Sequence, residues 1–235
     1  MTRAVIPECP PVLDIDIDVN KKKQHIYQAI YRLGRNFTWN PFKVRRAAWA
    51  AWHAHLNYQE LMSREGLTPP QAIARLYEKP PGEAISKEYR ISIGLIGHPY
   101  LLYDEHVNHR LLQRLQKADC RIVTPEMLTP HDMLEATQRI VGKALWTYEE
   151  EIIGSGGHYL ARGMDGVIGV VAFGCGPDSL IMDMVKREAD KLKTGSFMSL
   201  TLEEHTAETG VVTRLEAFLD MIARRKRRRE AGLCA

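Results

Sequence analysis

The sequence predicts an α/β fold: a flavodoxin-like, four-stranded parallel sheet in the order 2-1-3-4, preceded by an α-helical N-terminal segment. Two observations carry this prediction. After residue 82, short apolar runs alternate with helical patterns, as in parallel sheets with right-handed crossovers. Before it the pattern is helical only, and Lys79-Pro80-Pro81-Gly82 separates the two parts as a linker. We therefore expect a helical segment with an extended lead-in at 1–82, and at 83–235 an α/β domain with helices on both faces.

The first part is expected to hold three helices after its lead-in. Pro41 suits the first turn of the second helix, and Trp49, Trp52 and Leu56 give that helix an apolar stripe. We interpret this stripe as core, in preference to a surface for stacking on bases. The expected helices span residues 20–33, 41–64 and 69–77.

The second part alternates strands and helices and closes on a basic helix. Its apolar runs predict four strands, at residues 91–96, 121–124, 166–173 and 197–202. The intervening patterns predict helices at residues 104–117, 130–142, 144–162, 178–192 and 213–228.

Composition places few constraints on function. The 235 residues carry a formal net charge of +3, and much of it lies in the run Arg224–Arg229. We interpret this run as a solvated helix end, because cations are favourable at a helix C-terminus, so a nucleic-acid partner is not expected. The sequence shows no signal peptide and no apolar run long enough for a membrane span, which predicts a cytoplasmic protein.

The loops after three strands carry the candidate site. In a parallel sheet these loops lie on one edge, where ligands and cofactors bind. The first loop has His98 and Tyr100, and the third has Glu204 and His205. The second is Phe173-Gly174-Cys175-Gly176-Pro177-Asp178-Ser179, from which Gly174, Gly176 and Ser179 join the candidate cofactor-binding residues.

Cys175 is the most informative of these residues, because it stands in a glycine-rich turn that opens a helix. Helix N-terminal amides favour a thiolate, so we interpret Cys175 as a metal or cluster ligand or as a nucleophile. The four cysteines, Cys9, Cys120, Cys175 and Cys234, are widely spaced, and no disulfide framework is expected. Cys120 opens a strand and is expected in the core.

The sequence lacks the motifs that are typical of several enzyme classes. The sequence has no GxxxxGK[ST] and no GxGxxG after a strand, so no ATPase activity is assigned. The glycines of Gly154-Ser155-Gly156-Gly157 lie inside a helical stretch. No GxSxG nucleophile elbow is present, and no catalytic residue is assigned.

Together, these loops resemble a known group. Ile96-Gly97-His98-Pro99-Tyr100, Phe173-Gly174-Cys175-Gly176-Pro177-Asp178-Ser179 and Glu204-His205-Thr206 are similar to the C-terminal half of CoA-protein activases (DUF2229), which are related to 2-hydroxyacyl-CoA dehydratases and their activators. The resemblance covers residues 90–225. Family members also carry an N-terminal α/β domain with further cysteines, and Glu8-Cys9-Pro10 only faintly echoes such a motif.

The resemblance implies an iron–sulfur redox module of anaerobic metabolism. Cys175 would be one ligand of a [4Fe–4S] or linked double cluster in electron transfer, and Ser179 and His205 would donate hydrogen bonds around it. A separate polypeptide would supply the other cysteines. An ATP-dependent activator and a second copy of the chain are further partners considered. Two alternatives stay open: an acyl-CoA-handling subunit of a dehydratase- or reductase-type enzyme, and a cluster-free interaction domain.

Overall fold

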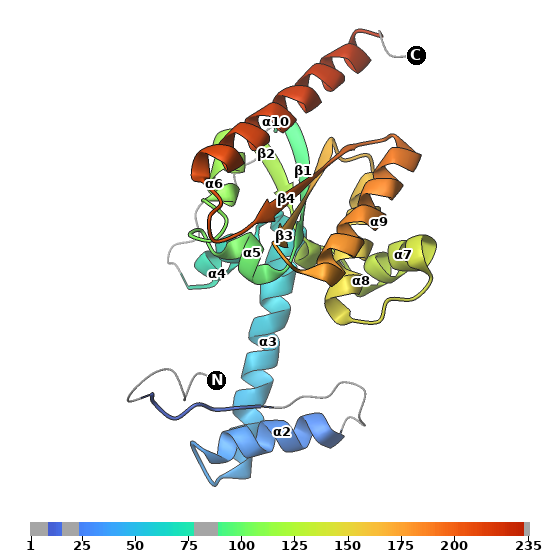
Figure 1. Ribbon diagram of the computed structural model, residues 1–235. Helices are drawn as coiled ribbons and strands as arrows, with labels where there is room; N and C mark the ends of the chain where they lie inside the picture. The colour runs from blue at the N-terminus through green and yellow to red at the C-terminus, as the bar shows by residue number, and fades with distance from the viewer. Residues whose placement is uncertain (1–8, 16–23, 78–88, 233–235) are drawn as a thin grey trace. The chain divides into compact units, whose positions relative to one another are not determined.

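The computed structural model describes residues 9–15, 24–77 and 89–232 (Figure 1). The chain divides into two compact units, Met1–Asn57 and Tyr58–Ala235. The domain boundary expected near residue 82 falls outside the described residues and stays a prediction.

The first unit consists, in its described part, of helix α2 (Gln24–Arg35) and the beginning of helix α3 (Pro41–Glu65). The Asn40 side chain caps α3, because its Oδ1 accepts hydrogen bonds from two backbone N–H groups of the first turn. The two helices pack closely at Gly34, where an added Cβ would lie 2.6 Å from the Val44 side chain.

The interpretation of Trp49 and Trp52 as core residues is wrong. Both side chains are exposed, and so is Leu56. The reason is the helix period: Val44 fixes the face of α3 that packs on α2, and Trp49 lies about 140° away around the helix.

The second unit is built on the predicted four-stranded sheet. All neighbouring strands are parallel and the order is β2-β1-β3-β4, which confirms the expected topology. Bounds lie within a residue of those expected from the apolar runs. The strands are β1 (Ile91–Gly97), β2 (Cys120–Val123), β3 (Gly166–Ala172) and β4 (Ser196–Leu202).

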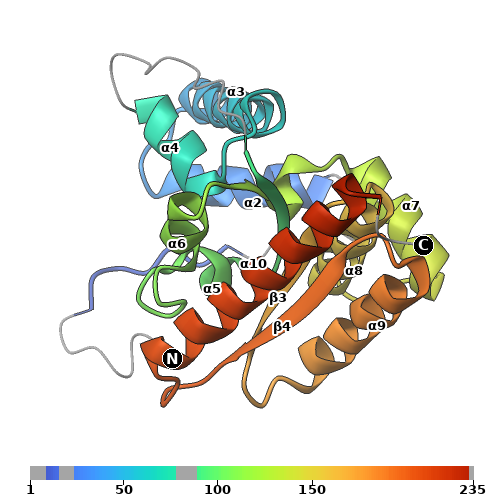
Figure 2. The same ribbon diagram turned by 90° about the horizontal axis from the view of Figure 1, so that it is seen from above.

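Helices cover both faces of this sheet (Figure 2). One face packs against α5 (Pro99–Tyr103), α6 (Leu111–Lys117) and α10 (Glu208–Glu230). The other packs against α8 (Thr147–Ala161) and α9 (Gly176–Leu192), and α7 (Pro130–Val141) lies on α8. A short helix α4 (Pro69–Tyr77) and the 3-10 turn η1 (Pro125–Met127) complete the described elements. Among the described helices, none combines the length and the apolar character needed to cross a membrane.

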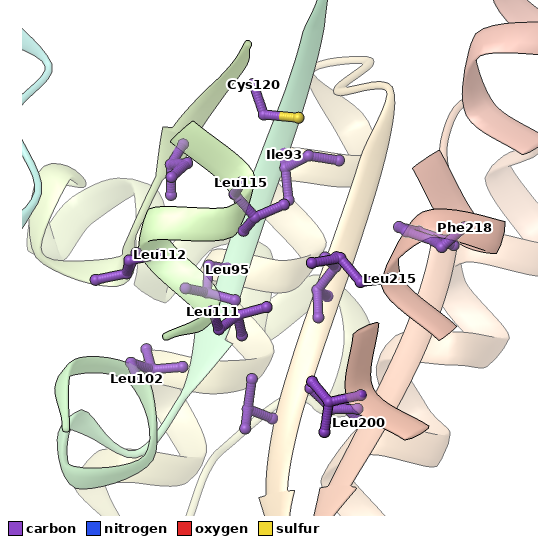
Figure 3. Packing of buried hydrophobic residues seen from close by; sticks show 14 of the residues in the cluster. Ile93, Leu95, Leu102, Leu111, Leu112, Leu115, Cys120, Leu200, Leu215 and Phe218 are labelled. Atoms are coloured by element: carbon purple, nitrogen blue, oxygen red, sulfur yellow. The ribbon is translucent and has the colours of Figure 1, made fainter. Parts of the chain in front are cut away.

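Each face of the sheet has its own core. Leu95 on β1 and Leu115 on α6 belong to a fully buried cluster that reaches Leu215 on α10 (Figure 3). Ile96, the next residue of β1, belongs to the cluster on the opposite face. Adjacent strand residues alternate between the two cores, which is why the strands read as nearly continuous apolar runs.

The helix expected at 104–117 begins only at Leu111: α6 fills the second half of that range, residues 104–110 form a turn, and a separate helix, α5, precedes the turn. Asp104 ends α5, and its Oδ1 accepts hydrogen bonds from the backbone N–H groups of His106 and Val107. Asn108 is buried within the turn and donates from Nδ2 to two carbonyl oxygens at the end of α5. The turn therefore interrupts a pattern that looked continuous in the sequence.

The basic run on α10 is more than a solvated helix end. Lys226 Nζ donates to the Arg90 carbonyl at 2.9 Å and lies 3.5 Å from an Asp165 carboxylate oxygen. Arg225 and Arg229 donate to the carbonyl of Lys193. Three of the six basic side chains thus fasten α10 to the amino-terminal edge of the sheet, because that edge presents carbonyl oxygens and a carboxylate.

Candidate functional site

The carboxyl edge of the sheet brings the three predicted loops to one side of the second unit, because β1, β3 and β4 run parallel. The β1 strand ends at Gly97, whose φ is 148° and whose added Cβ would lie 2.5 Å from the Val170 carbonyl oxygen. Only glycine fits at this position. The close approach to β3 directs the chain into His98, the N-cap of α5.

Cys175 lies where the sequence placed it, at the N-cap of α9. Gly174 precedes it with a φ of 79°, in the region that favours glycine, and this turn reverses the chain from β3 into α9. No atom lies within 4 Å of a Cβ added at Gly174 or Gly176, so open space adjoins the turn. The Ser179 hydroxyl donates to the Cys175 carbonyl oxygen at 2.8 Å, so it supports the helix start and does not reach the thiol.

Asp178 links Cys175 to His98. The residue is 3% exposed, and its Oδ1 lies 3.1 Å from His98 Nε2. The second carboxylate oxygen, Oδ2, is buried and makes no hydrogen bond. Burying a carboxylate oxygen without a hydrogen bond costs folding free energy. Such an oxygen is therefore expected to have a function or a positively charged neighbour. We call Cys175, Asp178 and His98 the thiol cluster.

Aromatic side chains surround His98 in the thiol cluster. Its ring stacks on Tyr100 at 5.7 Å between centroids and meets Tyr148 edge-on at 4.6 Å. These rings fix the imidazole plane, so that one ring nitrogen is directed at Asp178. Burial raises the pKa of Tyr100, with smaller effects of the same sign from Asp178 and Cys175.

The pKa of the Cys175 thiol is raised, contrary to the expectation of a favoured thiolate. The backbone N–H of Asp178 has the largest single effect and lowers this pKa, as a helix N-terminus should. Burial and the Asp178 carboxylate both raise it, and together they outweigh the amide. The thiol is therefore protonated at neutral pH.

Asp178→Asn should lower the pKa of Cys175, because the neutral amide removes the negative charge and leaves the backbone N–H in place. The thiolate would then form at a lower pH than in the unmodified chain. The pH dependence of the alkylation rate of Cys175 by iodoacetamide measures this shift. Asp183→Asn, which changes an exposed carboxylate on the same helix, is the matched control and should leave the profile unchanged. An unchanged profile in Asp178→Asn would show that the carboxylate does not control the thiol.

Glu204 and His205 do not join the thiol cluster. They lie in the loop after β4, both exposed, with His205 Nδ1 3.5 Å from a Glu204 carboxylate oxygen. Glu204 and Tyr100 instead line a cleft of about 900 Å³ at the carboxyl edge, to which Cys175 and His98 do not contribute. The remaining lining residues come from α5 and the turn after it, from the ends of β3 and β4 and the loop after β4, and from the start of α10: Leu101, Glu105, His106, Val107, His109, Arg110, Ala172, Phe173, Leu202, Glu203, Thr206 and Glu208.

The candidate residues thus form two groups on one edge. Sequence reasoning missed Asp178 as a site residue, although its position three residues after Cys175 places it in the same helical turn. It also missed Tyr148, because nothing in the sequence signals that the start of α8 reaches His98. His98 itself was found from its place after β1.

The described residues do not form a complete metal site. Within ranges 9–15, 24–77 and 89–232, no group of three or more His, Cys, Asp or Glu side chains is arranged to hold a metal ion. Cys120 is buried at the start of β2, as expected, and burial raises its pKa to about 11. Cys9 belongs to the first unit, and Cys234 lies outside the described residues. Cys175 is therefore the one described cysteine of the second unit that lies at the carboxyl edge of its sheet.

Comparison with known proteins gives one match. The model of the family described as CoA enzyme activase uncharacterised domain (DUF2229) matches residues 2–128, which is more than half of the chain. This range includes the first unit, β1 and β2, and overlaps the sequence resemblance at residues 90–128. Neither the curated proteins nor the solved structures gave a match.

Proposed function

Since the chain belongs to the CoA enzyme activase-related DUF2229 family, we propose that its second unit supplies Cys175 as one thiolate ligand of an iron–sulfur cluster shared with another polypeptide. The position of Cys175 carries the proposal: a thiol at a helix N-cap, on the ligand-binding edge of a parallel sheet, beside open space. Such a cluster, when bound, supplies one-electron transfer.

The described residues of the second unit supply one cysteine ligand at this edge of the sheet. Iron–sulfur clusters are held by about four protein ligands. The remaining thiolates would come from a second chain. The raised pKa of Cys175 does not oppose this role, because a coordinating metal ion deprotonates a thiol outright.

Other residues of the thiol cluster would orient the ligand. The backbone N–H of Asp178 lies next to the Cys175 thiol and can donate a hydrogen bond to the sulfur. The Asp178 carboxylate also holds His98, because its Oδ1 lies 3.1 Å from His98 Nε2. Gly174 and Gly176 leave the adjoining backbone uncovered by side chains.

The alternative of direct acyl-CoA handling has weaker support. The cleft beside β1, β3 and β4 is large enough for a sizeable ligand, and it lies where α/β proteins bind nucleotides. Its lining, however, carries four glutamates against one arginine and two histidines. A ligand with several phosphates would meet net repulsion there.

Cluster binding is tested on the chain purified without oxygen from its own organism, so that any second polypeptide stays bound. We expect iron and acid-labile sulfide in the unmodified protein and in Cys120→Ala, which removes a buried thiol at the opposite edge. Cys175→Ala should lose most of both, because the cluster loses a ligand. The measurement is iron and sulfide per chain, with electron paramagnetic resonance of the reduced protein. Equal iron content in Cys175→Ala and Cys120→Ala would refute the assignment.

A further inference from the structure

The first unit has an exposed aromatic surface that plays no part in the site described above. Phe42, Trp49, Trp52 and Leu56 are 74%, 65%, 54% and 40% exposed. They follow one another along α3 at intervals of seven, three and four residues, which places them on one side of the helix. We call these four residues the α3 stripe. Apolar side chains of this size rarely stay in water as a contiguous row, and such rows mark interaction sites.

The charge around the α3 stripe has one sign. Residues 24–57 contain five Lys and Arg and no Asp or Glu. Arg45 and Arg46 lie on α3 between Phe42 and Trp49, and both are exposed. The surface therefore combines aromatic anchors with cations that no acidic side chain of the same stretch neutralises. A partner that covers it must be apolar at the centre and negative at the rim.

The helical spacing and the residue types favour a protein as that partner. Side chains at intervals of three, four and seven residues are how one helix inserts into a groove of another protein. Four of the five cations are arginines, and Trp, Tyr and Arg dominate the residues that stabilise protein interfaces, whereas Lys is depleted there. A helix that lies on a membrane has a strongly charged face opposite its apolar one. Opposite the α3 stripe stand alanines instead, among them Ala47, Ala51 and Ala54.

Two further occupants are disfavoured by the same residues. A second copy bound through this surface would place two stretches rich in Arg and Lys, without Asp or Glu, against each other, and like charges across an interface repel. Single-stranded nucleic acid would need separate aromatic platforms along a groove, as in OB folds, and not a row on one helix.

We propose that the α3 stripe is a docking surface for an acidic protein, which receives Phe42, Trp49, Trp52 and Leu56 in an apolar groove with carboxylates at its rim. Trp49 and Trp52 at the centre are the anchors, and Arg45 and Arg46 select the partner by charge. Docking at the α3 stripe does not involve Cys175 and does not require a bound cluster.

The test uses the full-length chain in an extract of its own organism. A photoreactive phenylalanine analogue replaces Trp49 in one protein and Leu145 in the other. Leu145 is an exposed apolar residue of the second unit and serves as the matched control. After irradiation, crosslinked peptides are identified by mass spectrometry. We expect position 49, and not position 145, to crosslink to one protein at a segment rich in Asp and Glu.

The identified partner is then purified, and its affinity for the chain is measured by titration. Trp49→Ala with Trp52→Ala should weaken binding at least tenfold, and added salt should weaken binding to the unmodified chain. Alanine has the highest helix propensity, so circular dichroism should show α3 intact in the variant. Crosslinks from position 49 to a second copy, to the second unit, to lipid or to nucleic acid would overturn the proposal. Crosslinks no different from those of position 145 would overturn it too.

Discussion

Gly154→Ala should destabilise the second unit by about 2 kcal/mol, because two helices touch through this glycine. A Cβ added at Gly154 on α8 would lie 2.5 Å from the carbonyl oxygen of Met133 and 2.9 Å from its Cα, on α7. Both are backbone atoms, so no side-chain rotation can relieve the clash and α7 must move. Alanine's better helix propensity, about 1 kcal/mol, offsets part of the cost. The Thr137 hydroxyl, which donates to the Met133 carbonyl and lies 3.2 Å from that of Glu150, resists the movement.

The exchange rates of the β3 amides measure the stability of the second unit alone, because these core amides exchange with solvent only when that unit unfolds. Gly210→Ala is the matched control: Gly210 also lies in a helix, α10, but no atom comes within 4 Å of its added Cβ. That substitution should be neutral or stabilise by up to about 1 kcal/mol. Equal effects at the two positions would show that contact between α7 and α8 is not the cause.

The sheet could be predicted because each of its determinants is local. Apolar runs of strand length, separated by helical patterns, leave few parallel topologies open, and crossover handedness removes most of those. The same periodicity placed Gly154 inside a helix, and α8 confirms that placement. The turn at 104–110, in the first half of an expected helix, could not be foreseen in this way, because Asn108 makes the turn through contacts that leave no periodic signal.

The candidate site was predictable only in outline. Parallel strands had to place His98 and Cys175 on the same edge, and they do. Which residues of that edge meet depends on side-chain reach: Asp178 joins Cys175 to His98, whereas His205 turns outward beyond the end of β4. The pKa of Cys175 was misjudged because the helix N-terminus was considered without the carboxylate in its own first turn. The exposure of Trp49 was missed because periodicity shows that a helix has an apolar face and not what covers it.

Asn108→Ala should have the largest effect on stability, about 3 kcal/mol, because one buried side chain satisfies three backbone groups. Asn108 is 1% exposed. Its Nδ2 donates to the carbonyl oxygens of Leu101 at 3.1 Å and Leu102 at 2.8 Å, and its Oδ1 accepts from the backbone N–H of Leu111 at 3.1 Å. Alanine removes the bonds to the two carbonyl oxygens, and a buried polar group left without its partner costs about 1–3 kcal/mol. The Leu111 N–H keeps a second bond, at 3.2 Å, to the backbone carbonyl oxygen of residue 108.

The loss of the Asn108 hydrogen bonds should also change the cleft at the carboxyl edge. His109 and Arg110 follow with φ values of 53° and 60°, and both line that cleft. Left-handed backbone at two successive non-glycine residues persists only where surrounding contacts enforce it. Without Asn108, we expect this turn to relax and its amides to exchange faster than those of β1. Gln113→Ala, which removes an exposed hydrogen bond to Glu105 in the same region, should change stability by less than about 0.5 kcal/mol. If Asn108→Asp, which keeps the acceptor and loses both donors, were as stable as the unmodified chain, the bonds to α5 would not be what holds the turn.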